Sequence, residues 1–346
     1  MPDKNANVAT YEKWYSDNKD LYSACAITVQ KLIDTLLSQE GVPFHSIQYR
    51  IKTQDSFLAK CDNPKYTDPV NEITDVCGLR VITYTNKDVS RICEIIEQNF
   101  SVDKKNSINK AEQMHTNEVG YLSIHYIVGL SPSRKRLPEY RPYANIRFEI
   151  QVRTLLQHAW AEIEHDRSYK FSGELPAELK RRFYLVAGSL ELMDREFDRL
   201  SEEIDIYAKE VQSKTATGNL DVAIDSTSLQ EYLNIKLKNI PVEQRDFNKG
   251  DKELIQELSI FGITTLAQLD LLITDDIIDQ LEWKNGISNY MGALRSIMMA
   301  HDPKKYFACA WQKNWTGMSR TVYNLLEKIN PAIEECKSLF HFIPNS

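Results

Sequence analysis

Residues 146–153 alternate between apolar and polar side chains, and this pattern constrains the fold more than any other stretch of the chain. Every second position is apolar, which defines one face of a β-strand, while the opposite face carries Arg147, Glu149, Gln151 and Arg153. One interpretation is an edge strand whose charged face is solvated. The other is a functional strand, because a carboxylate flanked by arginines suits phosphate chemistry.

Strand-like and helix-like segments alternate around this stretch. Further strands are predicted at 47–52, 78–84 and 121–130, and helices at 11–39, 89–98, 155–169 and 178–214. The small polar residues 215–219 are the best linker candidate. We therefore predict an α+β fold, with a mixed β-sheet flanked by helices in residues 1–214 and a mostly helical domain in residues 219–346.

Composition excludes several classes of protein. The net charge of −7 argues against a nucleic-acid surface over the whole chain, so no DNA partner is expected. The 6 cysteines include no Cys-x-x-Cys pair, which argues against zinc ribbons and disulfide frameworks. No apolar run of about 18 residues and no apolar signal core are present, so we expect a cytoplasmic protein without a membrane span.

A second polar cluster precedes the alternating strand. Arg50 and Lys52 share a strand face, and Ser56 and Lys60 lie one helical turn apart if a helix begins there. This arrangement is typical of phosphate binding, although no glycine-rich loop accompanies it.

Two further clusters have both a functional and a structural interpretation. Asp75 stands at the entrance of a strand that carries Arg80, where an isolated Asp is usually a turn residue. Tyr121, Ser123 and His125 alternate onto one face, which would suit a stacked nucleobase. The structural alternative is a core tyrosine with a hydrogen-bonded hydroxyl.

Taken together, these clusters resemble the alarmone synthetases of the RelA/SpoT family. The matching motifs occur in the family's order over roughly residues 47–170: Arg50-x-Lys52-Thr53, Asp75-x-x-Gly78-x-Arg80-Val81, Gly120-Tyr121-x-Ser123-Ile124-His125, Glu149-Ile150-Gln151-Val152-Arg153-Thr154, and His158 to Asp166. The resemblance ends at about residue 212.

This resemblance implies a nucleotidyltransferase-like synthetase core with GTP pyrophosphokinase activity. Such enzymes transfer the β,γ-pyrophosphate of ATP to the ribose 3′-hydroxyl of GDP or GTP, which makes guanosine tetra- or pentaphosphate. Mg²⁺ is the implied cofactor. Phosphoryl chemistry of this kind depends on charge neutralisation, a metal and an aligned nucleophile.

The resemblance also implies roles for individual residues. Asp75 and Glu149 are expected to be catalytic and to bind the metal, with Glu149 as base for the 3′-hydroxyl. The expected ATP-binding residues are Arg50, Lys52, Ser56, Lys60 and Arg80. The expected acceptor-binding residues are Tyr121, Ser123, His125, Gln151 and Glu162.

Two departures from the family pattern leave the acceptor open. Asn117 to Val119 stand where a lysine is common, and Leu122 stands where a basic residue or Gln is common. Adenosine nucleotides or the tRNA 3′ end are therefore alternative acceptors, with tRNA the weaker candidate, and a non-catalytic nucleotide sensor is an alternative of a different class. The basic run 134–136 is interpreted as a solvated loop or as a site for a nucleotide or an RNA backbone.

The remaining expectations concern what accompanies the synthetase region. About 50 residues precede its motifs, too few for the family's separate hydrolase domain, so we expect synthesis without hydrolysis. Related small synthetases often form oligomers, which leaves a homo-oligomer open. Residues 257–266 resemble a helix-hairpin-helix turn, but nearby acidic residues favour plain helix packing, and we expect a regulatory or partner-binding role for the second domain.

Overall fold

The computed structural model describes residues 4–109, 123–170, 176–238, 251–280, 289–313 and 315–343, of which 4–7, 109, 165–170, 251 and 280 are described by their backbone alone. The chain divides into two compact units, Met1–Ser201 and Glu202–Ser346. Each unit has its own hydrophobic core. Within the described residues, no helix is both long and apolar enough to cross a bilayer.

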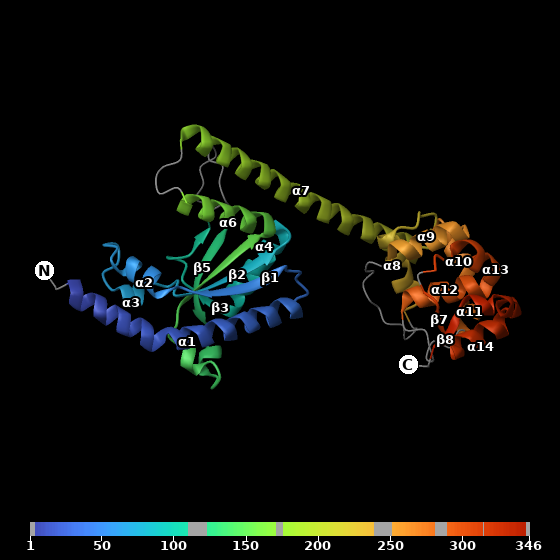
Figure 1. The fold of residues 1–346 in the computed structure, drawn as a ribbon, viewed down its shortest axis with the longest axis horizontal. Helices are drawn as coiled ribbons and strands as arrows, with labels where there is room; N and C mark the ends of the chain where they lie inside the picture. Colours follow the sequence, from blue (N-terminus) through green and yellow to red (C-terminus); the bar gives the residue numbers. More distant parts are fainter. Residues whose placement is uncertain are drawn as a thin grey trace. The chain divides into compact units, whose positions relative to one another are not determined.

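A mixed β-sheet forms the centre of the first unit (Figure 1). Its strand order is β1 (Ser46–Ile51), β2 (Cys77–Thr83), β6 (Phe148–Thr154), β5 (Ile124–Leu130) and β3 (Phe100–Val102), and β4 (Ile108–Asn109) also pairs with β5. The pairing of β2 with β6 is parallel, whereas β1 with β2 and β5 with β6 are antiparallel. The mixed sheet is confirmed, but β6 is a central strand, so the edge-strand interpretation of 146–153 is wrong.

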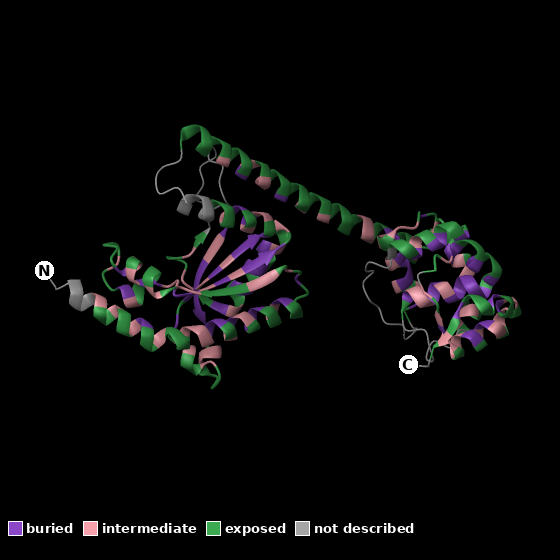
Figure 2. Cartoon of the chain, in the orientation of Figure 1, coloured by how far each residue is buried: buried purple, intermediate pink, exposed green. Residues whose placement is uncertain are grey.

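The apolar face of the sheet is covered by α1 (Lys4–Gln39) and α4 (Asn86–Asn99). Val29 and Ile33 of α1 and Ile92 of α4 are buried against the inward side chains of β2 and β6, such as Leu79 and Ile150. Figure 2 shows how strongly burial concentrates on these strands. The apolar residues that alternate along the strands and those that recur every 3.6 residues along the helices therefore pack into one core.

The opposite face of the same strands carries polar side chains. Arg80, Glu149 and Gln151 occupy the alternate positions of β2 and β6, and all three are only partly buried. The helix α6 (Leu155–Lys170) follows β6 directly and packs on this face, and α7 (Ala177–Ala216) follows it. This face carries the polar clusters found in the sequence.

A small second cluster anchors the segment between β1 and β2. It packs Phe57 and Cys61 of α2 (Gln54–Cys61) with Ile73 and Val76, which flank Asp75, against Tyr15 of α1. The Tyr15 hydroxyl donates a hydrogen bond to the backbone carbonyl of Lys52 at 2.6 Å. The short helix α3 (Pro69–Glu72) completes the segment.

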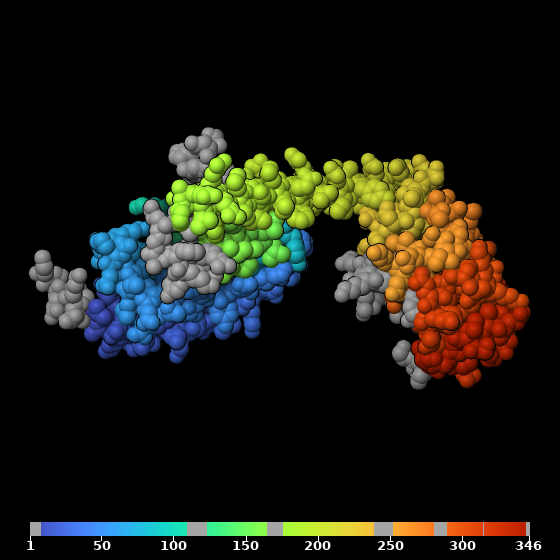
Figure 3. Space-filling model, turned by 45° about the horizontal axis from the view of Figure 1, so that its top comes forward, coloured from blue at the N-terminus to red at the C-terminus, as the bar shows by residue number. Residues whose placement is uncertain are grey.

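The second unit is mostly helical, as predicted. Its elements are the end of α7, α8 (Ser226–Lys236), α9 (Asp251–Phe261), α10 (Leu266–Leu272), α11 (Asp275–Gln280), α12 (Tyr290–His301), α13 (Pro303–Lys305), a π-helical turn (Tyr306–Ala310), α14 (Arg320–Ile329), a 3₁₀ segment (Pro331–Leu339), and the parallel pair β7 (Gly317–Ser319) and β8 (His341–Ile343). In space-filling view the atoms coloured orange to red gather in one body (Figure 3), and the buried residues of this unit form one core.

The boundary between the units differs from the predicted linker at 215–219. It falls between Ser201 and Glu202, inside α7, because Val211 near the end of α7 is 1% exposed within the core of the second unit. The 215–219 segment instead ends the helix, where Gly218 adopts a φ of +77°. The packing interpretation of the stretch 257–266 agrees with the burial of Leu258 and Leu266, both 0% exposed.

One buried ion pair lies in the second core. Glu257 is 0% exposed, and its two carboxylate oxygens accept hydrogen bonds of 2.9 and 2.6 Å from Arg295. The Tyr306 hydroxyl donates a third at 3.1 Å. These three hydrogen bonds of the carboxylate are thus all with residues of its own unit.

We expect Arg295→Met to destabilise the second unit by about 3–5 kcal/mol, because it leaves the Glu257 charge buried with no cation beside it. Chemical denaturation of the full chain, followed at the unfolding transition of this unit, measures the change. The double variant Glu257→Gln/Arg295→Met should lose less, since neither charge remains. A loss as large in the double variant as in the single one would show that packing, not charge, is responsible.

Candidate functional site

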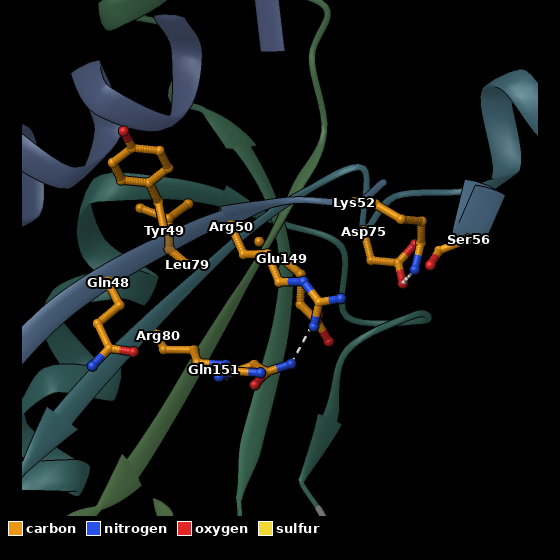
Figure 4. A pocket seen from close by; sticks show the side chains of 11 residues that line it. Gln48, Tyr49, Arg50, Lys52, Ser56, Asp75, Leu79, Arg80, Glu149 and Gln151 are labelled. Carbon is orange, nitrogen blue, oxygen red and sulfur yellow. Dashed lines mark hydrogen bonds and ion pairs between the residues drawn. The ribbon is translucent and has the colours of Figure 1, made fainter. Parts of the chain in front are cut away.

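Predicted site residues from three strands and one helix line a cavity of about 320 Å³, which we call the first cavity (Figure 4). Arg50 comes from β1, Arg80 from β2, Glu149 and Gln151 from β6, and Ser56 from α2. Lys52 and Asp75 also line it, and Gln48, Tyr49, Gly78 and Leu79 complete its wall. In Figure 4 the two arginines extend over the sheet, while Lys52 and Asp75 meet at one end.

The end of β1 and the start of α2 are held by local hydrogen bonds. The Lys52 amide donates to the carbonyl of Val76 at 2.9 Å, which ties the residue after β1 to the segment carrying Asp75. Thr53 caps α2, and its hydroxyl donates to the Ser56 hydroxyl oxygen at 2.8 Å. The helix predicted to place Ser56 and Lys60 one turn apart is confirmed.

Two lysines converge on a single oxygen of Asp75. Lys52 Nζ lies 3.0 Å and Lys60 Nζ 2.7 Å from Asp75 Oδ2. Burial by itself raises the pKa of Asp75, but the hydrogen bond from Lys60 and the nearby Lys52 ammonium outweigh it, so this pKa lies below its ordinary value. Asp75 is therefore an anion at neutral pH.

Glu149 is also held in its anionic form. His125 Nδ1 lies 2.7 Å from Glu149 Oε1, and Gln151 Nε2 donates to Glu149 Oε2 at 3.0 Å. Burial raises the pKa of Glu149, but these hydrogen bonds outweigh it and keep the pKa below its ordinary value. The Ser123 hydroxyl, 2.8 Å from His125 Nε2, fixes the other side of the imidazole ring.

A second cavity, of about 430 Å³, adjoins the same two carboxylates. Its lining includes Lys60, Lys65, His125 and Arg147, together with Asp75 and Glu149. The first and second cavities therefore share Asp75 and Glu149. A donor and an acceptor placed in separate cavities would meet at this pair.

Comparison with known proteins places most of this site within a known family region. A family profile described as "Region found in RelA / SpoT proteins" matches residues 49–174, which contain both carboxylates and most of the lining of both cavities. Residues 49–174 belong to the RelA/SpoT family. The recognition made from the sequence motifs is confirmed.

Two GTP pyrophosphokinases of Bacillus subtilis (strain 168) are similar to part of this chain. YjbM is 29% identical over 168 residues, which cover 47% of this chain and 74% of YjbM. YwaC is 23% identical over 167 residues, covering 47% of this chain and 76% of YwaC. Among solved structures, the small alarmone synthetase 1 of Bacillus subtilis has a TM-score of 0.48 at 23% identity, covering 56% of this chain and 98% of that one.

The expected ATP-binding and acceptor-binding residues are distributed over both cavities. Gln151, expected on the acceptor side, lines the first cavity, and Lys60, expected on the ATP side, lines the second. Both lie next to the shared carboxylates, where the two groups meet. Ser123 is buried, and its contact is with His125 rather than with either cavity.

Glu162 also lies on the side of the first cavity. Arg80 Nη1 is 2.7 Å from Glu162 Oε1, and Arg153 Nη2 is 3.8 Å from the same oxygen. An expected acceptor residue thus orients an expected ATP residue, because α6 crosses the sheet above β2 and β6. Tyr121, like Asn117 and Leu122, lies outside the described residues.

Two cations of the second cavity were not predicted as site residues. Lys65 follows α2 in an irregular segment, and the Arg147 guanidinium donates to Asp103 Oδ2 at 3.2 Å and to the Asn71 carbonyl at 2.5 Å. The alternating pattern had placed Arg147 on the face of Glu149, which was the available signal. No sequence signal pointed to Lys65.

The donor set of the RelA/SpoT site fits a hard divalent cation. Asp75 Oδ1 is buried and has no hydrogen-bond partner among the described residues, and it adjoins the cavity that Glu149 also lines. Mg²⁺ typically takes one or two protein carboxylates and completes its shell with water and phosphate oxygens. Asp75 and Glu149 are the two residues that would hold it.

We expect Lys60→Met to lower the stability of the first unit by about 1–2 kcal/mol at pH 7, because Asp75 loses a charged hydrogen-bond partner. A depressed carboxyl pKa stabilises the fold above the unfolded pKa, and this contribution is lost as pH falls through the folded pKa. Losing Lys60 raises that folded pKa. The stability that Asp75 loses on acidification should therefore be smaller than in the unaltered protein, so the difference in stability between the two proteins narrows as pH falls.

Urea denaturation over a series of pH values measures this change, with Lys65→Met as the matched control. Lys65 lines the same cavity but contacts the Tyr66 ring at 5.5 Å instead of Asp75. Equal pH profiles for the two variants would contradict the assignment.

Proposed function

We propose that this chain is a pyrophosphokinase that transfers the β,γ-pyrophosphate of ATP to the 3′-hydroxyl of GDP or GTP. The observation that carries the proposal is the meeting of two substrate-sized cavities at Asp75 and Glu149. The family of residues 49–174 and the names of the two Bacillus relatives support the same chemistry.

The first cavity is the proposed ATP site. Arg50 and Arg80 offer planar guanidinium groups for stacking on the adenine, and Glu162 holds Arg80 at 2.7 Å. Lys52 and Ser56 line the end of the cavity near Asp75, where the triphosphate would lie. Lys60, one helical turn beyond Ser56, reaches the same point from the second cavity.

The second cavity is the proposed acceptor site. His125, Lys65 and Arg147 supply positive or hydrogen-bonding groups for an acceptor that carries phosphates. They are the proposed substitutes for the lysine that family members commonly carry where Asn117 to Val119 stand in this sequence. Tyr121, which precedes β5, is the proposed stacking partner of the acceptor base.

Glu149 is the proposed base. Its carboxylate lies between the cavities, and His125 and Gln151 fix both of its oxygens. Because its pKa is held low, the group is ready to accept the proton of a 3′-hydroxyl during attack. Mg²⁺, when bound by Asp75 and Glu149, would neutralise phosphate charge in the transition state.

We expect Glu149→Gln and Asp75→Asn each to reduce pyrophosphate transfer by at least about 10²-fold, since each removes a charge from the reacting centre. The measurement is transfer of label from γ-³²P-ATP in Mg²⁺ to GDP, GTP, ADP, ATP or bulk tRNA, offered separately. Circular dichroism checks that the variants remain folded. Retained activity in either variant would exclude the proposed site.

The same panel decides the acceptor. Label on GDP or GTP supports a guanosine nucleotide as the acceptor, whereas label only on adenosine nucleotides or tRNA would contradict it. Nucleotide binding without any transfer would favour a sensor. The expected absence of hydrolysis is tested by offering the labelled product back to the protein.

We expect Glu162→Gln to raise the KM for ATP several-fold with a smaller effect on the acceptor KM, because Glu162 positions Arg80 in the first cavity. Steady-state kinetics with each substrate varied in turn measures both values. Glu164, exposed on the same helix, provides a matched change in Glu164→Gln, which should leave the ATP KM close to that of the unaltered protein. A Glu162 effect confined to the acceptor KM would restore the original assignment.

A further inference from the structure

A third cavity, of about 270 Å³, lies in the first unit between α6 and α7, apart from the other two. Most of its wall is apolar and is formed by Leu156, Trp160, Ala187 and Leu190. Trp160 is 6% exposed, and its ring is supported by Phe183 at 5.2 Å between ring centroids. Ligand pockets typically measure about 300–1,000 Å³, so this cavity suits a small ligand.

A buried carboxylate with one unpartnered oxygen lines this cavity. Asp194 is 3% exposed, and Asp194 Oδ2 accepts a hydrogen bond from the Thr154 hydroxyl at 2.7 Å. Its other oxygen, Oδ1, is buried and has no hydrogen-bond partner in the part of the chain that the structure describes. Burial raises the pKa of Asp194 to about 6, which leaves it mostly ionised at neutral pH.

The other charged side chains around the cavity already have partners. Arg195 Nη2 lies 2.5 Å from Glu191 Oε1. Asp198 accepts hydrogen bonds from the Asn86 amide at 2.8 Å and from the Asn86 side chain at 3.0 Å. Asp194 Oδ1 is therefore the buried carboxylate oxygen in this cavity that lacks a hydrogen-bond donor from any residue that the structure describes, and a cationic group could supply one.

We propose that the third cavity binds a small organic monocation, with its ammonium group on Asp194 and its apolar body against Trp160. A buried carboxylate without a cation is costly, and an ammonium donor removes this cost. The apolar wall excludes a bare metal ion or a phosphate as the preferred occupant, because neither could use it. Residues that line the first and second cavities play no part in this site.

The probe for this site is 2-phenylethylammonium, and the matched neutral probe is 2-phenylethanol. Both are titrated into the full chain, labelled with ¹⁵N-tryptophan, while the Trp160 indole signal, assigned with Trp160→Phe, is followed. We expect saturable binding of the cation at sub-millimolar concentration. The alcohol should bind at least about 10-fold more weakly, since it lacks the charge.

Two variants of equal charge change complete the test. Asp194→Asn should weaken binding of the cation at least about 10-fold, whereas Glu191→Gln, whose carboxylate already pairs with Arg195, should change it less than about 3-fold. Equal binding of the two probes, equal effects of the two variants, or no shift of the Trp160 signal would each overturn the proposal. The comparison of the two probes on the unaltered protein stands even if Asp194→Asn does not fold.

Discussion

The parallel pairing of β2 with β6 is the constraint on which the rest of the site depends. It sets Gly78 opposite Glu149 and Arg80 opposite Gln151, so the polar side chains of the two strands lie on the same face of the sheet. Asp75, just before β2, is thereby brought to the same edge as Glu149. Strands that are far apart in the sequence need a long crossover to pair in parallel, and the segment 84–147 provides it.

Placing two carboxylates at one point is electrostatically unfavourable, and the structure compensates for it separately at each group. Asp75 is neutralised by two lysines that reach it from the end of β1 and from α2. Glu149 is instead held by hydrogen bonds with His125 and Gln151 of its own sheet. The pair is thus asymmetric, with lysine cations around one member and hydrogen-bond donors around the other, which suits different roles in one reaction.

The sequence predicted the elements whose periodicity was clear. The alternation at 78–84 and 146–153 and the long apolar spacing of residues 11–39 became β2, β6 and α1 with small changes of boundary. The short strands β3, β4, β7 and β8 were not predicted, since two or three residues carry no measurable period.

The sequence predicted which residues form the site better than it predicted how these residues are arranged. Motif order identified Asp75, Glu149, Arg50 and Arg80, and these four meet at one cavity. Which substrate side Glu162 serves depends on how α6 crosses the sheet, and Lys65 reaches the site through an irregular segment. Both depend on the tertiary structure, which the order of residue types along the chain does not determine. The unit boundary inside α7 is of the same kind, because helical periodicity continues across it.

The division of the site into two cavities that share only a narrow edge affects how such a protein can diverge. In the proposed function, substitutions in the wall around Lys65 and Arg147 would change which acceptor is recognised without changing the wall around Arg50 and Arg80. Asp75 and Glu149, by contrast, belong to both walls, so a change there would affect both proposed substrates. Selection on such a scaffold can therefore retain one donor and one reaction while exploring many recipients.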